Sequence, residues 1–398
     1  MTRPESYPTI REEIRRMLPK LKALRRKLHQ HAELSGEEKQ TANIVADFLR
    51  MMRPTQLSTG VGGYGLLVVF DSGREGPTIA LRAELDALPI DEKNDFAHRS
   101  LYSGKAHKCG HDGHMAILAG IAALLVGHPL TRGRLILLFQ PAEETGQGAR
   151  RMVSDPRFQA FQPDYILALH NFPGFPFGQV ILKKGAIFCA SRGMIIHLKG
   201  KSAHAAHPEQ GVNPAAAMSE LIQQLIALPN DTDLQHVFAA VTIVHSHMGE
   251  MAFGTSPGEA LVMCTLRTEK DLDMEILVKK ATDHVAAVCL QHGLGFSIDW
   301  SDVFQTTDND AELIDRLEET AAELGMEVHY LDQAFRPSED FGVFTSLFPG
   351  ALFGMGAGEH YPGLHQDEYD FPDDLMVEGI LMLWRSMQHL LNQDFPKK

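Results

Sequence analysis

The sequence contains few cysteines, no long apolar run and no basic tract, and each absence excludes a class of protein. Its four cysteines lie far apart in 398 residues, so the chain is not a disulfide-stabilised scaffold. The longest apolar stretch, within AILAGIAALLVG, is shorter than a bilayer span and suits a buried helix. Lys and Arg occur only in short groups such as LRRKLH, and the net charge is -14. That balance argues against nucleic acid or an anionic membrane as a partner.

The first residues, MTRPESYPTIREEIRR, lack the apolar core of a signal peptide, so we expect a cytoplasmic protein. Hydrophobic residues make up 44% of the chain and charged residues 22%, as in ordinary soluble globular proteins. A length of 398 residues exceeds what one ordinary hydrophobic core organises. We therefore expect two domains.

The order of apolar segments predicts how these domains are arranged. Short buried runs alternate with helical periodicity, which is typical of an α/β domain with a largely parallel sheet flanked by helices. From about residue 188 the pattern changes to alternating strands and two helices, which indicates a smaller α+β domain. The α/β pattern then returns. We expect a discontinuous larger domain at 1–187 and 300–398, with the smaller domain inserted at 188–299. The runs assigned to the parallel sheet are GLLVVF, TIALRA, RLILLF, YILALH and ALFGMG.

The segment HKCGHDGH, residues 107–114, combines three histidines, a cysteine and an aspartate. Either it holds a metal, or it is an unusually polar start to the helix that follows. A thiolate with imidazoles and a carboxylate suits zinc or another borderline transition metal better than magnesium or calcium. The helix N-terminus beside Cys109 is expected to favour the thiolate. Cys109 and His111 are two residues apart, so a loop can point both inward.

Polar side chains also follow the predicted strands. TIALRA is followed by Glu84 and Asp86, RLILLF by Gln140-Pro141-Ala142-Glu143-Glu144, and YILALH ends in His170. In open α/β sheets, ligands bind just beyond the carboxyl ends of the strands. We therefore expect these groups to meet HKCGHDGH at one edge of the sheet.

The adjacent glutamates are the most informative pair, because neighbouring side chains leave the backbone in different directions. One can bind a metal while the other holds a water for attack, as hydrolytic metal sites require. Alone, the pair would more simply cap the following Thr-Gly turn. The nearby imidazoles and thiol favour the catalytic interpretation. Glu339 and Asp340 in PSEDFG either support this site or cap a turn.

Several longer motifs resemble metallopeptidase family M20. They match best its subfamily D of N-acyl-amino-acid amidohydrolases, hippurate hydrolases and auxin-conjugate hydrolases, and they extend over nearly the whole chain. The motifs are RKLHQHAELSGEEKQTA, ALRAELDALPI, AHKCGHDGHMA, LLFQPAEETGQGA, ALHNFPG, GKSAHAAHP and GLHQDEYDF.

The resemblance implies a zinc-exopeptidase-like catalytic domain with an inserted lid and dimerisation domain, and two divalent ions per subunit. The ions could be zinc, manganese, nickel or cobalt. Glu143 would be the general base, and Asp86 would orient a ligand imidazole. His204 in GKSAHAAHP would polarise the scissile carbonyl, and Arg267 would face the substrate carboxylate. The implied metal ligands are Cys109, His111, Glu144, His170 and His365.

The chain departs from this pattern in three places. Glu84 stands where the branch commonly has Asp, and Ala32 where it has Pro. The lid usually carries N-V-I-P, whereas this chain reads Gly254-Thr255-Ser256-Pro257. Loss of that asparagine amide removes a usual contact with one end of the substrate. The acyl and amino-acid preference is therefore left open.

Other motifs fail their structural context. GVGGYG fits a dinucleotide fingerprint but precedes a strand instead of opening a helix. GTSPG fits a nucleophile elbow, but Pro257 follows the serine and has no N–H to donate to an oxyanion. The strings H-E-x-x-H and P-C-x-x-C are absent, which excludes those zinc peptidases and nucleobase deaminases.

The sequence thus predicts a metal-dependent amidohydrolase acting on small N-acyl amino acids or related conjugates. A dipeptidase of the same family is the nearest alternative, because its chemistry is the same. A homologue that binds ligand without turnover is a further alternative, although no expected ligand or base is missing. We expect a homodimer formed through the inserted domain.

Overall fold

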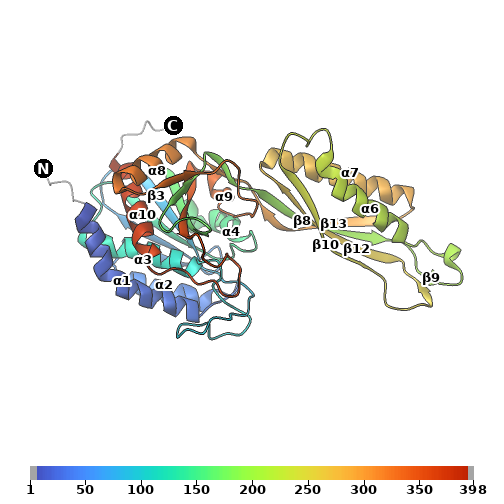
Figure 1. Cartoon of the computed structure of the whole chain (residues 1–398), viewed down its shortest axis with the longest axis horizontal. Coiled ribbons are helices and arrows are strands. Elements are labelled where there is room, and N and C mark those ends of the chain that lie inside the picture. The colour runs from blue at the N-terminus through green and yellow to red at the C-terminus, as the bar shows by residue number, and fades with distance from the viewer. Residues whose placement is uncertain (1–6, 393–398) are drawn as a thin grey trace. The chain divides into compact units, whose positions relative to one another are not determined.

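The computed structural model describes residues 7–392, which form two compact units (Figure 1). The first unit comprises the described residues up to Ile187, Thr307–Gln333 and those from Asp340 onward. The second comprises Phe188–Thr306 and the short segment Ala334–Glu339. The boundary expected at residue 299 falls inside strand β13, Gly295–Phe304. Because β13 pairs with β8 along its length, it belongs with the second unit.

An eight-stranded sheet forms the centre of the first unit, in the order β1-β2-β4-β3-β5-β16-β6-β15. Its middle strands β4, β3, β5 and β16 run parallel. Strand β2 is antiparallel to both of its neighbours, and β6 is antiparallel to β16 but parallel to β15. The middle strands are buried on both faces, which explains their unbroken apolar runs. The bounds are β1 Gln56–Val61, β2 Gly65–Asp71, β3 Thr78–Glu84, β4 Arg134–Gln140, β5 Tyr165–Pro173, β6 Val180–Leu182, β15 Val328–Tyr330 and β16 Gly350–Gly358.

Helices cover this sheet, and α3 (His111–Gly127) is the most buried of those described. It packs on β3 and contacts α1, α2 and α10, so it is apolar on nearly every side. The HKCGHDGH segment therefore opens a helix that is fixed from several directions. The helices are α1 Tyr7–Gln30, α2 Lys39–Arg50, α3, α4 Gly148–Ser154, α5 Pro156–Gln159, α8 Ala311–Leu324, α9 Gly342–Thr345 and α10 Leu375–Asn392; β7 Gly185–Phe188 pairs with β14 Thr307–Asn309.

The second unit is an antiparallel sheet in the order β10-β12-β8-β13, with two helices packed against it (Figure 1). Alternate residues of β8 and β12 are buried beneath α6 and α7, which accounts for their two-residue periodicity. The bounds are β8 Ala190–Lys199, β9 Ala203–His204, β10 Ala239–Met248, β11 Thr255–Ser256, β12 Glu259–Thr268, α6 Ala215–Ala227, α7 Asp271–Gln291 and the 3-10 turns Pro208–Gln210 and Leu228–Asn230.

Among residues 7–392, no helix combines the length and apolar character that crossing a membrane requires.

Candidate metal centre

The parallel strands β3, β4 and β5 end at one edge of the sheet, as the sequence predicts. The polar side chains that follow or end these strands therefore lie at that edge. The segment before α3 crosses the same edge. Gly110 lies there with a φ of 98°, in the left-handed region that favours glycine. A Cβ at Gly110 would also overlap the amide of Asn171. Glycine therefore lets the Cys109 loop approach the end of β5.

Cys109, His111 and His170 form one compact group. Their donor atoms all lie within 4.8 Å of one another, and Cys109 Sγ is 3.5 Å from His170 Nε2. The Nδ1 atoms of His111 and His170 donate to the carbonyl oxygens of Asp86 and Asn171, each at 2.9 Å. Since a carbonyl only accepts, both rings present an unprotonated Nε2 to the group when neutral.

Glu143 and Glu144 adjoin this group from the loop after β4. His111 Nε2 is 3.9 Å from Glu143 Oε2 and 3.8 Å from Glu144 Oε1. His365 Nε2 is 3.7 Å from the same Glu144 oxygen. Cys109, Glu144 and His365 thus form a second group with donor atoms within 4.8 Å of one another. The two groups share Cys109, so the five side chains make one continuous cluster.

Asp86 ties parts of this cluster together. Its Oδ2 accepts from Ser35 Oγ at 2.7 Å and from the backbone N–H of Glu144 at 3.0 Å. Its Oδ1 lies 3.7 Å from Nδ1 of His111. Burial alone would raise the pKa of Asp86, but the contacts with His111, Ser35 and Glu144 lower it below its ordinary value. Asp86 is therefore held as a carboxylate.

His114 lies beside the cluster but uses both ring nitrogens elsewhere. Nδ1 is 2.7 Å from Glu84 Oε2, and Nε2 is 2.6 Å from Asn171 Oδ1. Glu84 also pairs with the buried Arg82. Burial raises the pKa of Glu84, yet Arg82 and the neighbouring histidines lower it well below its usual range. This carboxylate anchors His114 and Arg82.

Burial changes the protonation of the cluster in two ways. It raises the pKa of the Cys109 thiol to about 12, with the Glu144 carboxylate adding to the shift. The expectation that Cys109 is a thiolate before metal binds is thus wrong, because burial and the Glu144 carboxylate favour the neutral thiol. Burial also lowers the pKa of His170 and His365, which keeps these imidazoles neutral. Neutral imidazole is the form that binds metals. His111 differs, because burial lowers its pKa but Cys109, Glu84 and Asp86 outweigh burial and raise it well above its ordinary value, so metal binding there displaces a proton.

Glu143 is almost completely buried, with 5% of its surface exposed. One of its oxygens lies 3.4 Å from the backbone nitrogen of Asp340. The Asp340 carboxylate itself accepts from Gln140 at 2.7 Å, from Arg82 at 3.0 Å and from the backbone of Ala149 at 2.9 Å. The sequence left open whether Asp340 supports the site or caps a turn. The geometry assigns it to the support of the Glu143 loop.

His204 and Arg267 lie in the second unit, so the cluster of the first unit does not include them. His204 ends β9 and pairs directly with Thr255 of β11. The stretch that replaces N-V-I-P is therefore the immediate neighbour of His204. Arg267 Nη1 donates to the carbonyl oxygen of Arg336 at 2.9 Å and to Ser338 Oγ at 3.0 Å.

Similarity to known proteins places this chain in a class of enzyme. An N-acetyldiaminopimelate deacetylase of Anoxybacillus flavithermus is 31% identical over 367 residues, 91% of this chain and 95% of the relative. An N-acetyl-L-cysteine deacetylase of Bacillus subtilis is 32% identical over 390 residues, 94% of this chain and 89% of the relative. The protein is therefore a hydrolase that acts on amide bonds.

Within that class, the chain belongs to peptidase family M20/M25/M40, whose profile matches residues 80–389. A Bacillus subtilis protein described as a dinuclear metal-binding peptidase of the M20 family has a similar crystal structure. It superposes with a TM-score of 0.80 at 25% identity, covering 95% of this chain and 99% of the other. The resemblance predicted from the motifs is thus confirmed.

Proposed function

We propose that the protein is a metal-dependent amidohydrolase that cleaves the amide of small N-acyl amino acids or related conjugates. The observation that carries this proposal is the continuous cluster of five donor side chains with the buried Glu143 beside it. The deacetylase names of the curated relatives support an acylated amino acid as the substrate. The name of the similar crystal structure supports two metal ions.

The donor set fits such a metal centre. His111 Nε2 is buried and, among the described residues, has no hydrogen-bond partner. A buried ring nitrogen in this state costs free energy unless an ion or water satisfies it. Two divalent ions, when bound, would lower the pKa of water and polarise the carbonyl. The mixture of thiol, imidazole and carboxylate favours zinc, manganese, nickel or cobalt. We assign Cys109, His111, Glu144, His170 and His365 as the ligands.

Glu143 is assigned as the general base. Its carboxylate lies beside two of the assigned ligands, because the donor atoms of Glu143, His111 and Glu144 are within 4.8 Å of one another. From there it can take a proton from the attacking water and deliver it to the leaving amine. Asp86 positions both His111 and Glu144, because it contacts the ring of one and the backbone of the other.

His204 is assigned to the scissile carbonyl. The backbone N–H of Ala206 donates to His204 Nδ1 at 3.0 Å, so the ring carries its proton on Nε2 when neutral. That N–H can donate to a carbonyl oxygen as negative charge develops. Arg267 is assigned to the substrate carboxylate through its second terminal nitrogen, since Nη1 holds the segment of Arg336 and Ser338.

A homodimer and a cytoplasmic location complete the proposal. The inserted unit leaves Met251 and Phe253 fully exposed in the loop between β10 and β11. Two large apolar side chains so close together suit a protein contact better than solvent. We assign this loop to the contact with a second copy.

A release assay on the metal-loaded protein tests the activity. The panel sets N-acetyl, N-benzoyl and longer N-acyl amino acids beside free dipeptides, each with and without a chelator. We expect chelator-sensitive cleavage of the acylated substrates alone. Cleavage of dipeptides would assign the protein to the peptidases instead. Absence of turnover with metal bound would favour a ligand-binding homologue.

A further inference from the structure

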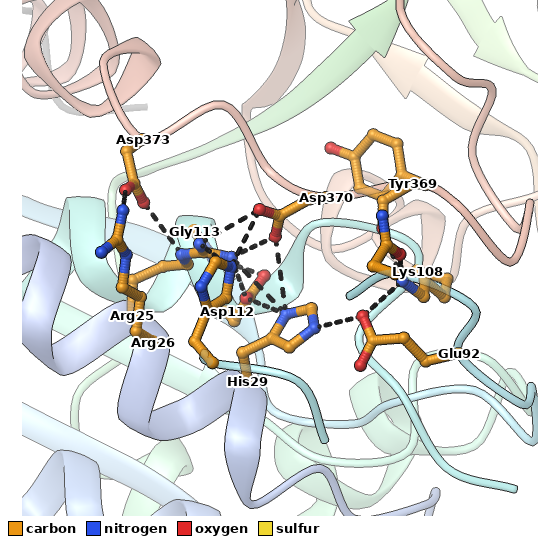
Figure 2. Close-up of polar contacts among 12 residues, drawn as sticks. Arg25, Arg26, His29, Glu92, Lys108, Asp112, Gly113, Tyr369, Asp370 and Asp373 are labelled. Atoms are coloured by element: carbon orange, nitrogen blue, oxygen red, sulfur yellow. Dashed lines mark hydrogen bonds and ion pairs between the residues drawn. The ribbon is translucent and has the colours of Figure 1, made fainter. Parts of the chain in front are cut away.

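Lys108 is a completely buried lysine directly before Cys109. Its Nζ donates to Glu92 Oε1 at 2.6 Å, Asn94 Oδ1 at 2.7 Å and the carbonyl oxygen of Tyr369 at 2.7 Å. An ammonium group has three hydrogens, so these contacts use all of them. Figure 2 shows Lys108 pointing toward Glu92 and Tyr369. The side chain thus connects the Cys109 loop with the loop that follows His365.

The backbone of Lys108 makes the same connection. Its carbonyl oxygen accepts from the backbone N–H of His365 at 2.8 Å. His365 has a φ of 63°, in the left-handed region that residues other than glycine rarely adopt, and 51% of its side chain is exposed. A strained, half-exposed residue persists only when its surroundings hold it. Lys108 therefore holds His365 directly through its backbone carbonyl, and it holds the following loop through the bond of its side chain to the Tyr369 carbonyl.

A chain of buried charges continues from Lys108 and returns to the same loop. Glu92 Oε1 also contacts His29 Nε2 at 2.9 Å, and His29 Nδ1 lies 2.8 Å from Asp112 Oδ2. Arg25 then bridges Asp112 at 3.1 Å and Asp370 at 2.5 Å (Figure 2). The network thus joins Lys108 and Asp112 of HKCGHDGH to the segment after His365.

We propose that Lys108 is a positioning residue that sets the placement of His365 relative to Cys109 and Glu144. The inference rests on the proposed function, because it takes these three side chains as ligands of one ion. A buried ammonium is costly compared with an apolar side chain of similar size, so stability alone is a poor reason to place one here. Its hydrogen bonds instead tie the Tyr369 carbonyl, in the loop after His365, to Glu92 and Asn94.

The test compares Lys108→Met with Lys93→Met. Lys93 is the matched control, because its exposed Nζ pairs with Asp367 on the same loop at 2.5 Å. Each protein is equilibrated with graded free Zn²⁺, and the bound ions per chain are counted. We expect Lys93→Met to bind like the unchanged protein. We expect Lys108→Met to keep one tight ion and to bind the second at least about tenfold more weakly, since each lost tenfold is only ~1.4 kcal/mol.

His365→Ala separates positioning from a general loss of structure. If Lys108 acts through His365, the double variant Lys108→Met/His365→Ala should bind the second ion no more weakly than His365→Ala alone. Additive losses would overturn the inference, as would unchanged binding of both ions by folded Lys108→Met. Failure of the unchanged protein to bind two ions would instead overturn the proposed function.

Asn94→Ala decides the question if Lys108→Met does not fold. This half-buried residue bonds to Lys108 Nζ and donates to the carbonyl oxygen of Glu368 at 2.8 Å. Its removal loosens the same loop without leaving a buried carboxylate unpaired. We expect a smaller, two- to fivefold weakening of the second ion alone (about 0.4–1 kcal/mol). Equal binding by Asn94→Ala and the unchanged protein would contradict the positioning role.

Discussion

Glu143 and Glu144 are adjacent residues of the same type, but their side chains lie in different environments. Glu144 lies within reach of His111 and His365, and its backbone is held by Asp86. Glu143 is buried beside His111 and the backbone of Asp340. The loop after β4 thus divides the pair between metal binding and proton transfer in our proposal. Each assignment can be tested separately.

Replacing Glu143 by Gln keeps the volume of the side chain and one oxygen that can accept from the backbone of Asp340, but it removes the base. We expect turnover to fall by about 10²–10⁴-fold, the usual contribution of a positioned base. The number of bound metal ions should stay at that of the unchanged protein. Initial rates together with metal analysis check both points. Retained turnover would contradict the assignment of Glu143, and a lost ion would make it a ligand.

His29 gives a pH dependence to stability. Burial lowers its pKa, but hydrogen bonds with Asp112 and Glu92 outweigh this and raise it to about 9. Because the folded pKa exceeds the unfolded one, the protonated ring stabilises the fold fully below about pH 6.5. This contribution, on the order of 3 kcal/mol, is lost as the pH rises through 9. The free energies of unfolding in urea of the unchanged protein and of His29→Gln should therefore converge as the pH rises toward 10. If the difference in unfolding free energy between the two proteins stays constant with pH, the predicted contribution of His29 is wrong.

Much of the cluster could be predicted from motifs, because Cys109, His111 and the Glu143–Glu144 pair lie within short strings of chemically distinctive residues. The supporting network could not. Lys108 bonds to a carbonyl 261 positions away and Arg25 to a carboxylate 345 positions away. Nothing local in the sequence marks such partners. The low exposure of Lys108 and Arg25 emerges only from the fold.

At the scale of elements, the parallel strands and α3 were predictable because their burial leaves continuous apolar runs. Strand β13 was not predicted, and the expected domain boundary cut through it. It is an edge strand of the second sheet, and its sequence GFSIDWSDVF is half polar and largely exposed. Its place is decided by backbone pairing with β8, which leaves little trace in side-chain pattern.

Helix α3 offers a matched pair of substitutions. A Cβ at Gly113 would overlap the buried ring of Phe371, whereas one at Gly127 meets only an ordinary contact with Glu13. We expect Gly113→Ala to destabilise the protein by about 1–3 kcal/mol through overpacking. Gly127→Ala should instead be neutral or stabilising by up to ~1 kcal/mol, because alanine favours helix. Thermal or urea unfolding of both variants measures the contrast. Equal effects at the two positions would show that the Phe371 ring can move to accommodate the new methyl group without loss of stability.

At the scale of the whole molecule, the proposed dimer depends on the exposed loop of the inserted unit. Replacing Met251 and Phe253 together by serine should convert the protein from a dimer to a chain of 44.1 kDa in sedimentation. Both side chains are fully exposed, so folding of the single chain should be unaffected. The pair Leu101 and Tyr102, exposed in the first unit, provides a control that should leave the dimer intact. A monomeric unchanged protein would rule out this part of the proposal.

The discontinuity of the first unit has a consequence for biosynthesis. Strand β16 lies between β5 and β6, and α10 supplies much of the core, yet both emerge from the ribosome last. The second unit is nearly complete by Thr306, lacking only the segment 334–339. The nascent chain must therefore carry the apolar α3 and an open sheet edge while the later unit folds. His365 is synthesised after the second unit, so the proposed metal site can be completed only late in synthesis.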